Sequence, residues 1–140
     1  MNVIPFLPHH VLGLTVHKDQ QKELPKLDMD YGIYLYKAGP AFSYQVDGEI
    51  IACAGIVKIW PGRASAWSLL SDKTAKCMSR LTRAVIRFLE VTEESRIEIT
   101  VNDGFEAGHR WATLLGFQRE HLMRKYWTDG RNVWMYSRIK

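Results

Sequence analysis

The spacing of apolar residues predicts a β-meander in the first half of the chain. Phe42, Tyr44 and Val46 alternate with polar neighbours, which is the period of a half-buried strand. Asp-Gly and Pro-Gly pairs, which favour tight turns, separate this stretch from two further β-rich stretches. The expected strands and turns are Ala41 to Val46, Asp47-Gly48, Glu49 to Ile59, Pro61-Gly62 and Ala64 to Leu70.

After Ser71 the apolar period changes to that of a helix. Cys77, Leu81, Val85 and Leu89 lie four residues apart and form one broad apolar stripe. The elements expected beyond this helix are a strand from Arg96 to Val101, a helix from Phe105 to Leu115, and two strands, His121 to Trp127 and Asn132 to Ile139, joined by a hairpin turn at Thr128 to Arg131.

The first forty residues are the hardest to interpret, because three prolines interrupt the pattern. They leave room for one helix from about Pro8 to Leu24. The segment Asp28 to Pro40 fits either a short helix or an edge strand. The full order of elements predicts an α+β, or mixed α/β, fold.

Composition indicates one globular domain that covers residues 1–140. Hydrophobic residues make up 46% of the chain, and no apolar run approaches the roughly 20 residues that span a bilayer. Since the N-terminus also lacks a secretory signal pattern, we expect a cytoplasmic protein without a membrane segment. Two cysteines, Cys53 and Cys77, do not make a disulfide framework, and we expect both to be small buried hydrophobes.

The charge balance favours an anionic partner. An excess of 19 basic over 15 acidic residues gives a net charge of +4, which suits a cofactor phosphate, a nucleic acid or an acidic protein. Arg80, Arg83 and Arg87 lie on the polar side of the expected central helix. They form either a solvated face or a cluster that attracts phosphate or nucleic acid.

The segment from Val101 to Phe117 narrows the fold most. A strand runs into a short helix that ends on an apolar pair followed by Gly116, which suits a left-handed helix cap. This Leu-Gly-Phe ending, in its place after the second helix, resembles the GCN5-related N-acetyltransferase superfamily, and the resemblance covers about residues 41–140. Residues 1–40 then correspond to the family's variable N-terminal part.

The resemblance implies a central mixed, mostly antiparallel sheet flanked by helices, with a C-terminal hairpin. In this family the sheet opens between its fourth and fifth strands, which here are Ala64 to Leu70 and Arg96 to Val101. Acetyl-coenzyme A lies in the opening, and its acetyl group passes to a primary amine. The implied function is an acyl-coenzyme A-dependent N-acyltransferase that uses acetyl-coenzyme A as co-substrate.

The resemblance also implies a site for the diphosphate at the start of the central helix. Backbone N–H groups at a helix N-terminus bind phosphate, and the family places glycines there. This chain has Lys76 and Met78 where glycines are expected, so charge would replace close backbone approach. The expected cofactor-binding residues are Leu70, Ser71, Lys73, Thr74, Lys76, Cys77, Met78, Ser79, Arg80 and, at the end of the fifth strand, Asn102. Asn102 fits a capping or turn role equally well.

The catalytic positions depart from the family pattern. A tyrosine four residues before the Gly-Phe pair protonates the leaving thiolate in the family, and this chain has Ala112 there. His109 is the expected acid or base, since imidazole titrates near neutral pH, and its alternative interpretation is a helix-surface histidine. Tyr126 is the second expected catalytic residue, and Glu98 is a further substitute.

Two other classes of function stay open. The tail, with its Leu-Gly-Phe and Thr-Asp-Gly segments, is similar to acetyltransferase-like proteins of tailed phages, so the chain could be a catalytically degenerate phage structural or host-interaction protein, in host cytoplasm or virion. Nucleic-acid binding through the arginines of the central helix is the other class. A metal site is not expected, because His9, His10 and His17 lack a completing cluster. A homodimer is one option for the oligomeric state.

Overall fold

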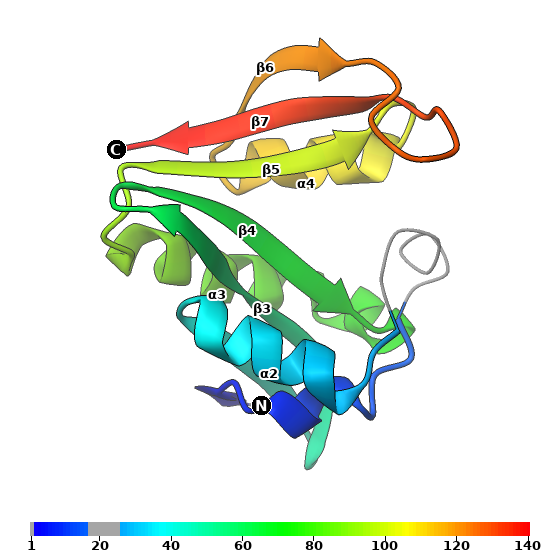
Figure 1. Ribbon diagram of the computed structural model, residues 1–140. Helices are drawn as coiled ribbons and strands as arrows, with labels where there is room; N and C mark the ends of the chain where they lie inside the picture. The colour runs from blue at the N-terminus through cyan, green and yellow to red at the C-terminus, as the bar shows by residue number, and fades with distance from the viewer. Residues whose placement is uncertain (1, 17–25) are drawn as a thin grey trace. The chain divides into compact units, whose positions relative to one another are not determined.

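The strands of the computed structural model, which describes residues 2–16 and 26–140, follow the order β1-β2-β3-β4-β5-β7-β6 in one mixed sheet (Figure 1). This arrangement confirms the expected α+β fold. The strands are β1 (Asn2–Pro5), β2 (Ala41–Val46), β3 (Glu49–Trp60), β4 (Arg63–Leu70), β5 (Arg96–Asn102), β6 (Gln118–Met123) and β7 (Val133–Ile139). The helices are η1 (Pro8–Val11), α2 (Met29–Ala38), η2 (Asp72–Lys76), α3 (Met78–Val91) and α4 (Glu106–Leu114). No helix in the described ranges is long and apolar enough to cross a bilayer.

The chain divides into two units. Unit 1 comprises Met1–Lys58 and Ala66–Ala84, and unit 2 comprises Ile59–Ser65 and Val85–Lys140. Strand β4 and helix α3 each contribute residues to both units. That the whole chain is one domain stays a prediction.

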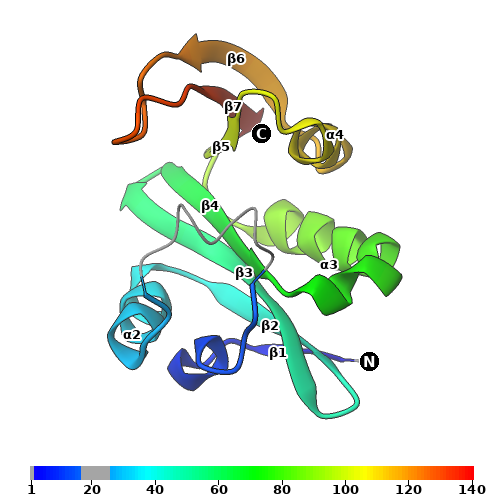
Figure 2. The same ribbon diagram turned by 90° about the vertical axis from the view of Figure 1, so that its right-hand side faces the viewer.

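Unit 1 contains the expected hairpin and an additional edge strand. β2 pairs antiparallel with β3, and β1 pairs antiparallel with β2 from Asn2 opposite Gln45 to Pro5 opposite Phe42. In Figure 2, α2 and the first half of α3 lie on opposite faces of the unit 1 sheet. The core on the α2 side is formed by Phe6, Val11, Leu14, Leu35, Cys53 and Leu69.

The segment 28–40 is a helix rather than an edge strand. The side chain of Asp28 caps it by accepting a hydrogen bond from the Tyr31 backbone N–H at 3.0 Å. Gly32 is required where α2 meets η1, because a Cβ there would lie 2.2 Å from the carbonyl oxygen of Pro8. The Asp28 cap therefore decides between the two alternatives that periodicity left open.

The helix expected from about Pro8 to Leu24 is wrong in its described part. Only Pro8–Val11 is helical, as a 3-10 turn, and Val16 makes an antiparallel bridge with Ser71. Pro8 at the first position favours one turn, and Gly13 disfavours a second turn after it. Residues 17–25 lie outside the described residues.

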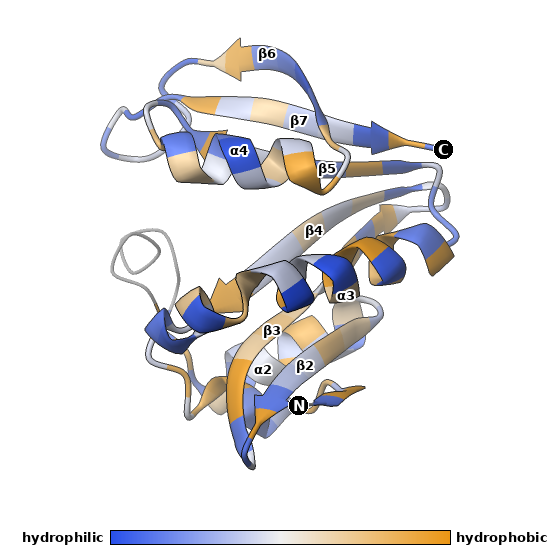
Figure 3. Ribbon diagram, turned by 180° about the vertical axis from the view of Figure 1, so that it is seen from behind, coloured by the Kyte–Doolittle hydropathy of each residue, from blue (hydrophilic) through white to orange (hydrophobic). Residues whose placement is uncertain are grey.

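Helix α3 is the amphipathic helix that the apolar period predicts. Leu81, Val85 and Leu89 are buried, whereas Arg83 and Arg87 are exposed. Figure 3 shows the resulting alternation of hydrophilic and hydrophobic segments along α3. Cys77 is the C-cap residue of η2 and directly precedes Met78, the first residue of α3.

In unit 2, β5 is the central strand. It pairs antiparallel with β7 along its whole length, and β6 pairs antiparallel with the other side of β7. The parallel pairing of β4 with β5 covers Arg63–Ser65 and Arg96–Glu98, the first three residues of each strand. Helix α4 lies along one face of the β5–β7 pair (Figures 1 and 2).

The C-terminal hairpin is confirmed, but its first strand is shifted. β6 begins at Gln118 rather than His121, because the chain turns at Gly116, whose φ is 92°, and enters the strand at once. β6 ends at Met123, so the expected turn at 128–131 is part of a longer loop, in which the N–H groups of Tyr126 and Trp127 donate to the Arg131 carbonyl. β6 also contains a bulge: Arg119 opposes Tyr136 and His121 opposes Met135, which leaves Glu120 as an extra residue.

Candidate functional site

The start of α3 is built from two consecutive helical turns. Ser71 caps η2: its hydroxyl accepts from the Lys73 N–H at 3.3 Å, and its carbonyl accepts from the Thr74 hydroxyl at 2.8 Å. The Cys77 N–H then bonds the Thr74 carbonyl at 2.9 Å, and the Leu81 N–H bonds the Cys77 carbonyl at 2.9 Å. Ser71 and Thr74 are thus buried by local capping, and neither side chain faces solvent.

The helical segment before α3 carries Asp72 in its first turn and Lys73 and Lys76 in its last turn. Lys73 forms an exposed ion pair with Glu49 at 2.5 Å, whereas Lys76 is exposed and forms no ion pair within the described residues. The first turn of α3 carries no acidic residue. Positive side chains and helix N–H groups at one place favour an anion.

The other expected cofactor residues differ in accessibility. Ser79 and Arg80 are exposed, while Leu70, Cys77 and Met78 are half-buried. Beneath them the Tyr44 phenol is buried, and burial raises its pKa. The nearby positive charges of Arg80 and Arg83 lower the pKa of Tyr44, against the effect of burial.

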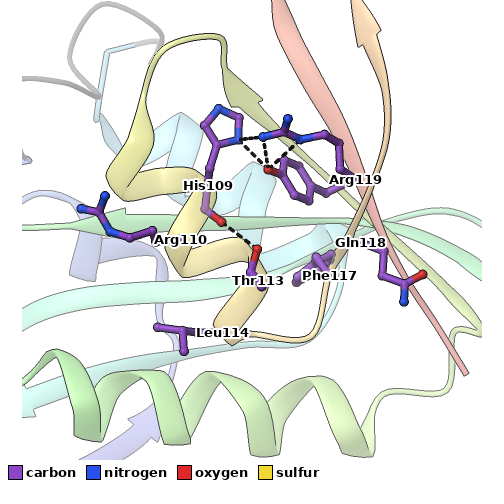
Figure 4. A pocket seen from close by; sticks show the side chains of 8 residues that line it. His109, Arg110, Thr113, Leu114, Phe117, Gln118 and Arg119 are labelled. Carbon is purple, nitrogen blue, oxygen red and sulfur yellow. Dashed lines mark hydrogen bonds between the residues drawn. The ribbon is translucent and has the colours of Figure 1, made fainter.

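His109 in α4 is the centre of a hydrogen-bonded cluster in unit 2. Its side chain is 7% exposed, so its interpretation as a helix-surface histidine is wrong. Nδ1 lies 2.5 Å from the Tyr136 hydroxyl and Nε2 lies 3.0 Å from the Asn102 carbonyl oxygen. Figure 4 shows His109 beside the guanidinium of Arg119.

The partners of His109 define its tautomer. The carbonyl of Asn102 can only accept, so Nε2 carries the proton. In the neutral ring Nδ1 then accepts from the Tyr136 hydroxyl. Since a backbone carbonyl has no proton to exchange, the Tyr136 hydroxyl is the partner through which Nδ1 can exchange a proton.

Arg119 connects this cluster to the surface. Its Nε and Nη2 donate to the Tyr136 hydroxyl at 3.3 and 3.2 Å, and Nη2 lies 3.3 Å from His109 Nδ1. Its guanidinium carbon lies 4.3 Å from the centre of the Trp134 ring, in a cation–π contact. Sequence reasoning missed both Arg119 and Tyr136, because they are ordinary members of alternating strands.

An open surface hollow of about 690 Å³ adjoins the cluster. Figure 4 shows it between α4 and the start of β6. The lining residues are His109, Arg110, Thr113, Leu114, Phe117, Gln118, Arg119 and Tyr136. The hollow therefore brings His109 to a surface site, and Tyr126 is not part of its lining.

Tyr126 and Asn102 have other surroundings. Tyr126 is 48% exposed in the loop after β6, and its ring packs edge-on against Trp127 at 5.1 Å. The Asn102 side-chain oxygen accepts from the Trp127 indole N–H at 2.8 Å. Asn102 therefore holds the loop through its side chain and His109 through its backbone carbonyl. A structural role of this kind suits its position at the end of a strand.

The remaining candidate base, Glu98, belongs to an ion-pair network. Its carboxylate is held by Arg63 at 2.8 Å and by Arg96 at 2.6 Å. Hydrogen bonds from Arg63 and then Arg96 lower the pKa of Glu98 despite its burial. A carboxylate held ionised in this way is a poor proton acceptor, so Glu98 is a structural residue.

No three His, Cys, Asp or Glu side chains gather as metal ligands within the described ranges. His9 and His10 lie together, with ring centres 4.7 Å apart, and His17 lies outside the described residues.

No protein-family model matches this chain, and no curated protein matches it. Solved structures do match over nearly its whole length. Ard1 from Thermoplasma volcanium has a TM-score of 0.81 at 15% identity, with 99% of this chain and 96% of that chain covered. A GNAT-family acetyltransferase from Streptococcus pneumoniae has a TM-score of 0.76 at 13% identity, with 99% of both chains covered. A variant of the spermidine N-acetyltransferase SpeG from Vibrio cholerae has a TM-score of 0.75 at 12% identity, with 99% and 95% covered. The chain therefore has the fold of the GNAT-family acetyltransferases, as the resemblance implied.

Proposed function

We propose that this chain is an N-acyltransferase that moves an acetyl group from acetyl-coenzyme A to a primary amine. The observation that carries the proposal is the fold, which aligns 99% of the chain with acetyltransferases. In the reaction the amine nitrogen bonds to the acetyl carbon and the carbon–sulfur bond breaks. The amine gives up one proton, and the sulfur leaves as a thiol.

The start of α3 supports a diphosphate site in unit 1. Three features favour a phosphate: the helix N–H groups, the lack of an acidic residue in the first turn of α3, and Lys76, which forms no ion pair within residues 2–16 and 26–140. Acetyl-coenzyme A supplies an activated acyl group when bound. We propose that it is held by the segment 70–80, with Ser79 and Lys76 at the exposed surface.

Calorimetry with acetyl-coenzyme A tests this site. Lys76→Glu should weaken binding at least roughly ten-fold, because one attraction becomes a repulsion. The matched control is Lys26→Glu, which makes the same charge change at another exposed position of unit 1. Equal affinities for both variants would mean that the diphosphate binds elsewhere. If no heat of binding is measured at millimolar acetyl-coenzyme A, acetyl-coenzyme A is excluded as the co-substrate.

We propose that proton transfer involves His109, reached through the Tyr136 hydroxyl. His109→Ala should lower kcat and change its pH profile, because the proposed proton-transfer group is lost. Tyr126 is the second proposed catalytic residue, and Tyr126→Phe tests its exposed hydroxyl. An unchanged pH profile in His109→Ala would leave that residue a structural role.

Release of free thiol from acetyl-coenzyme A in the presence of primary amines measures turnover. Spermidine belongs in the amine panel, because one of the similar structures is a spermidine N-acetyltransferase. Small diamines and a peptide with a free N-terminus complete the panel.

The second candidate function is a non-catalytic binding protein, such as a phage structural or host-interaction protein. Ala112 at the family's tyrosine position and the engagement of both His109 nitrogens favour it. A coenzyme A mass carried through purification, together with no turnover on the amine panel, would support a binding role. Turnover on any amine would exclude it.

A further inference from the structure

Helix α2 is apolar on two sides. Leu35, on the side that packs into the core of unit 1, is 2% exposed, as expected for a helix that buries one stripe. Met29, Ile33 and Tyr36 are 44%, 37% and 52% exposed and form a second stripe, the α2 stripe. Their spacing of four and then three residues places them in one line along the helix. The solvent side of a surface helix is usually polar, so the α2 stripe is suited to contact another protein surface.

The 3-10 turn η1 extends this apolar surface. It lies directly against α2, since the Pro8 carbonyl oxygen would be 2.2 Å from a Cβ on Gly32. Gly32 lies beside the α2 stripe, three residues after Met29, so η1 borders the stripe. Figures 1 and 2 show η1, in blue, next to α2. Leu7 and Leu12, which flank η1, are 42% and 55% exposed.

The other flank of the α2 stripe carries two charges of opposite sign. Asp30 lies in the first turn of α2 and Lys37 in the last turn. They are seven residues apart, so they lie on the same flank, about 10 Å apart along the helix axis. Both are exposed, and neither forms an ion pair within residues 2–16 and 26–140. This flank therefore has one positive and one negative end.

These positions match the heptad pattern of an antiparallel helix pair. Met29, Ile33 and Tyr36 fall at positions d, a and d, while Asp30 and Lys37 fall at successive e positions. A two-fold axis across two antiparallel helices brings like flanks together with their directions reversed. Asp30 then lies beside Lys37 of the partner subunit, and this pair forms twice. Parallel helices would instead bring like charges together.

We propose that two copies of this chain form an antiparallel dimer through α2, in which the α2 stripes pack against each other and Asp30 pairs with Lys37 of the partner subunit. The surface that carries the contact belongs to unit 1. The dimer goes beyond the proposed transferase activity and does not depend on it. One short helix and one turn make a small interface, so we expect a dimer that dissociates at micromolar concentrations.

Sedimentation equilibrium between about 5 and 500 µM protein tests the dimer, with a Kd expected below roughly 100 µM. Ile33→Glu puts a carboxylate in the middle of both stripes and should leave a monomer at every concentration. The matched control is Leu114→Glu, a comparable change on α4 in unit 2, where the side chain is 67% exposed. The control should leave the Kd unchanged.

Two charge variants test the orientation of the helices. Asp30→Lys and Lys37→Asp each turn both attractions into repulsions, so each should raise the Kd at least roughly ten-fold. An equal mixture of the two variants should associate as tightly as the wild type, because each copy then meets opposite charges on the other. Both positions are exposed, so these variants keep the fold.

The proposal is overturned if the wild type is still monomeric at about 500 µM, roughly five times a Kd of ~100 µM. It is also overturned if Ile33→Glu dimerises like the wild type, or if Leu114→Glu weakens the dimer as much as Ile33→Glu does. A mixture of the charge variants that fails to recover association would exclude the antiparallel pairing. None of these measurements uses acetyl-coenzyme A, so their outcome is independent of the transferase activity.

Discussion

The two faces of the β5–β7–β6 sheet use arginine in opposite ways. On one face Arg63 and Arg96 hold Glu98, and Arg96 also holds Glu120 at 2.7 Å. On the other face, Arg119 has a phenol, an imidazole and an indole as neighbours, and it forms no ion pair with a carboxylate of the described residues. The first arrangement satisfies its charges internally, so it stabilises the sheet. The second arrangement leaves positive charge at the surface, so it is suited to bind an anion.

The alternation of strand residues creates this difference. Glu98 is opposite Ser137, and the next residue pair along, Ile99 and Tyr136, points to the other face. Ser137 donates to Glu120 at 2.5 Å, whereas Tyr136 bonds His109 and Arg119. One strand, β7, thus supplies a hydroxyl to each cluster.

The largest expected effect comes from removing the Glu98 carboxylate. Glu98 lies on the face where arginines are paired with carboxylates, which we call the balanced face. Glu98→Gln should lower the free energy of unfolding by about 2 kcal/mol, since two arginines lose a buried partner but remain about a third exposed to water. Urea unfolding measures it. Glu93→Gln, an exposed neighbour, is the control and should change stability by less than about 0.5 kcal/mol. Equal effects would mean that the network contributes nothing beyond net charge.

Removing the phenol hydroxyl tests the other face. Tyr136→Phe should cost about 1–2 kcal/mol, because His109 Nδ1 loses its donor and stays buried. Tyr126→Phe removes the same atom from an exposed ring and should be close to neutral. Identical unfolding curves for wild type and Tyr136→Phe would contradict a stabilising hydrogen bond between Tyr136 and His109.

Acid should weaken the face on which Arg63 and Arg96 hold Glu98 and Glu120. Arg96 and Ser137 lower the pKa of Glu120 to about 2, and the pKa of Glu98 is lowered as well. Since both folded values lie below the unfolded value of about 4.3, this stabilisation is complete above that pH and is lost as the pH falls toward 2. Urea midpoints at pH 7, 4, 3 and 2 should fall less steeply in Glu120→Gln. The Glu120 effect is smaller than that of Glu98→Gln, because its side chain is 33% exposed.

The smallest effect is expected at the surface of the hollow. Arg110→Gln should change the free energy of unfolding by less than about 0.5 kcal/mol, because Arg110 is exposed and forms no ion pair with any residue that the structure describes. A loss above 1 kcal/mol in urea unfolding would show that Arg110 has a structural role, and the contrast between the two faces would fail there.

The sequence predicts the fold where one periodicity is long. The stripe of Leu81, Val85 and Leu89 and the alternation of β2 and β5 each repeat often enough to define an element. Short elements with prolines do not, which is why the edge strand β1 was missed and the single turn η1 was expected to be a helix up to about Leu24. At the start of β6, the left-handed Gly116 allows the strand to begin three residues earlier than expected.

The site was harder to predict because its contacts join residues far apart in the chain. His109 could be selected from its place in α4, but its partner Tyr136 lies 27 positions later and pairs with it only once β7 is laid beside β5. Arg119 likewise shows no local signal. The segment 70–80 is different, since a helix start is a local feature, and the structure does place a helical turn and α3 there.

Glu120 is a residue that the strand could lose. Because it is the extra residue between two regular pairs, deleting it would restore an uninterrupted ladder in which Arg119 still opposes Tyr136 and His121 still opposes Met135. Single-residue deletions inside strands usually reverse the direction of every later side chain, yet here none would change sides. Natural homologues with β6 one residue shorter would thus keep the arginine over Trp134 while lacking the acid that holds Arg96.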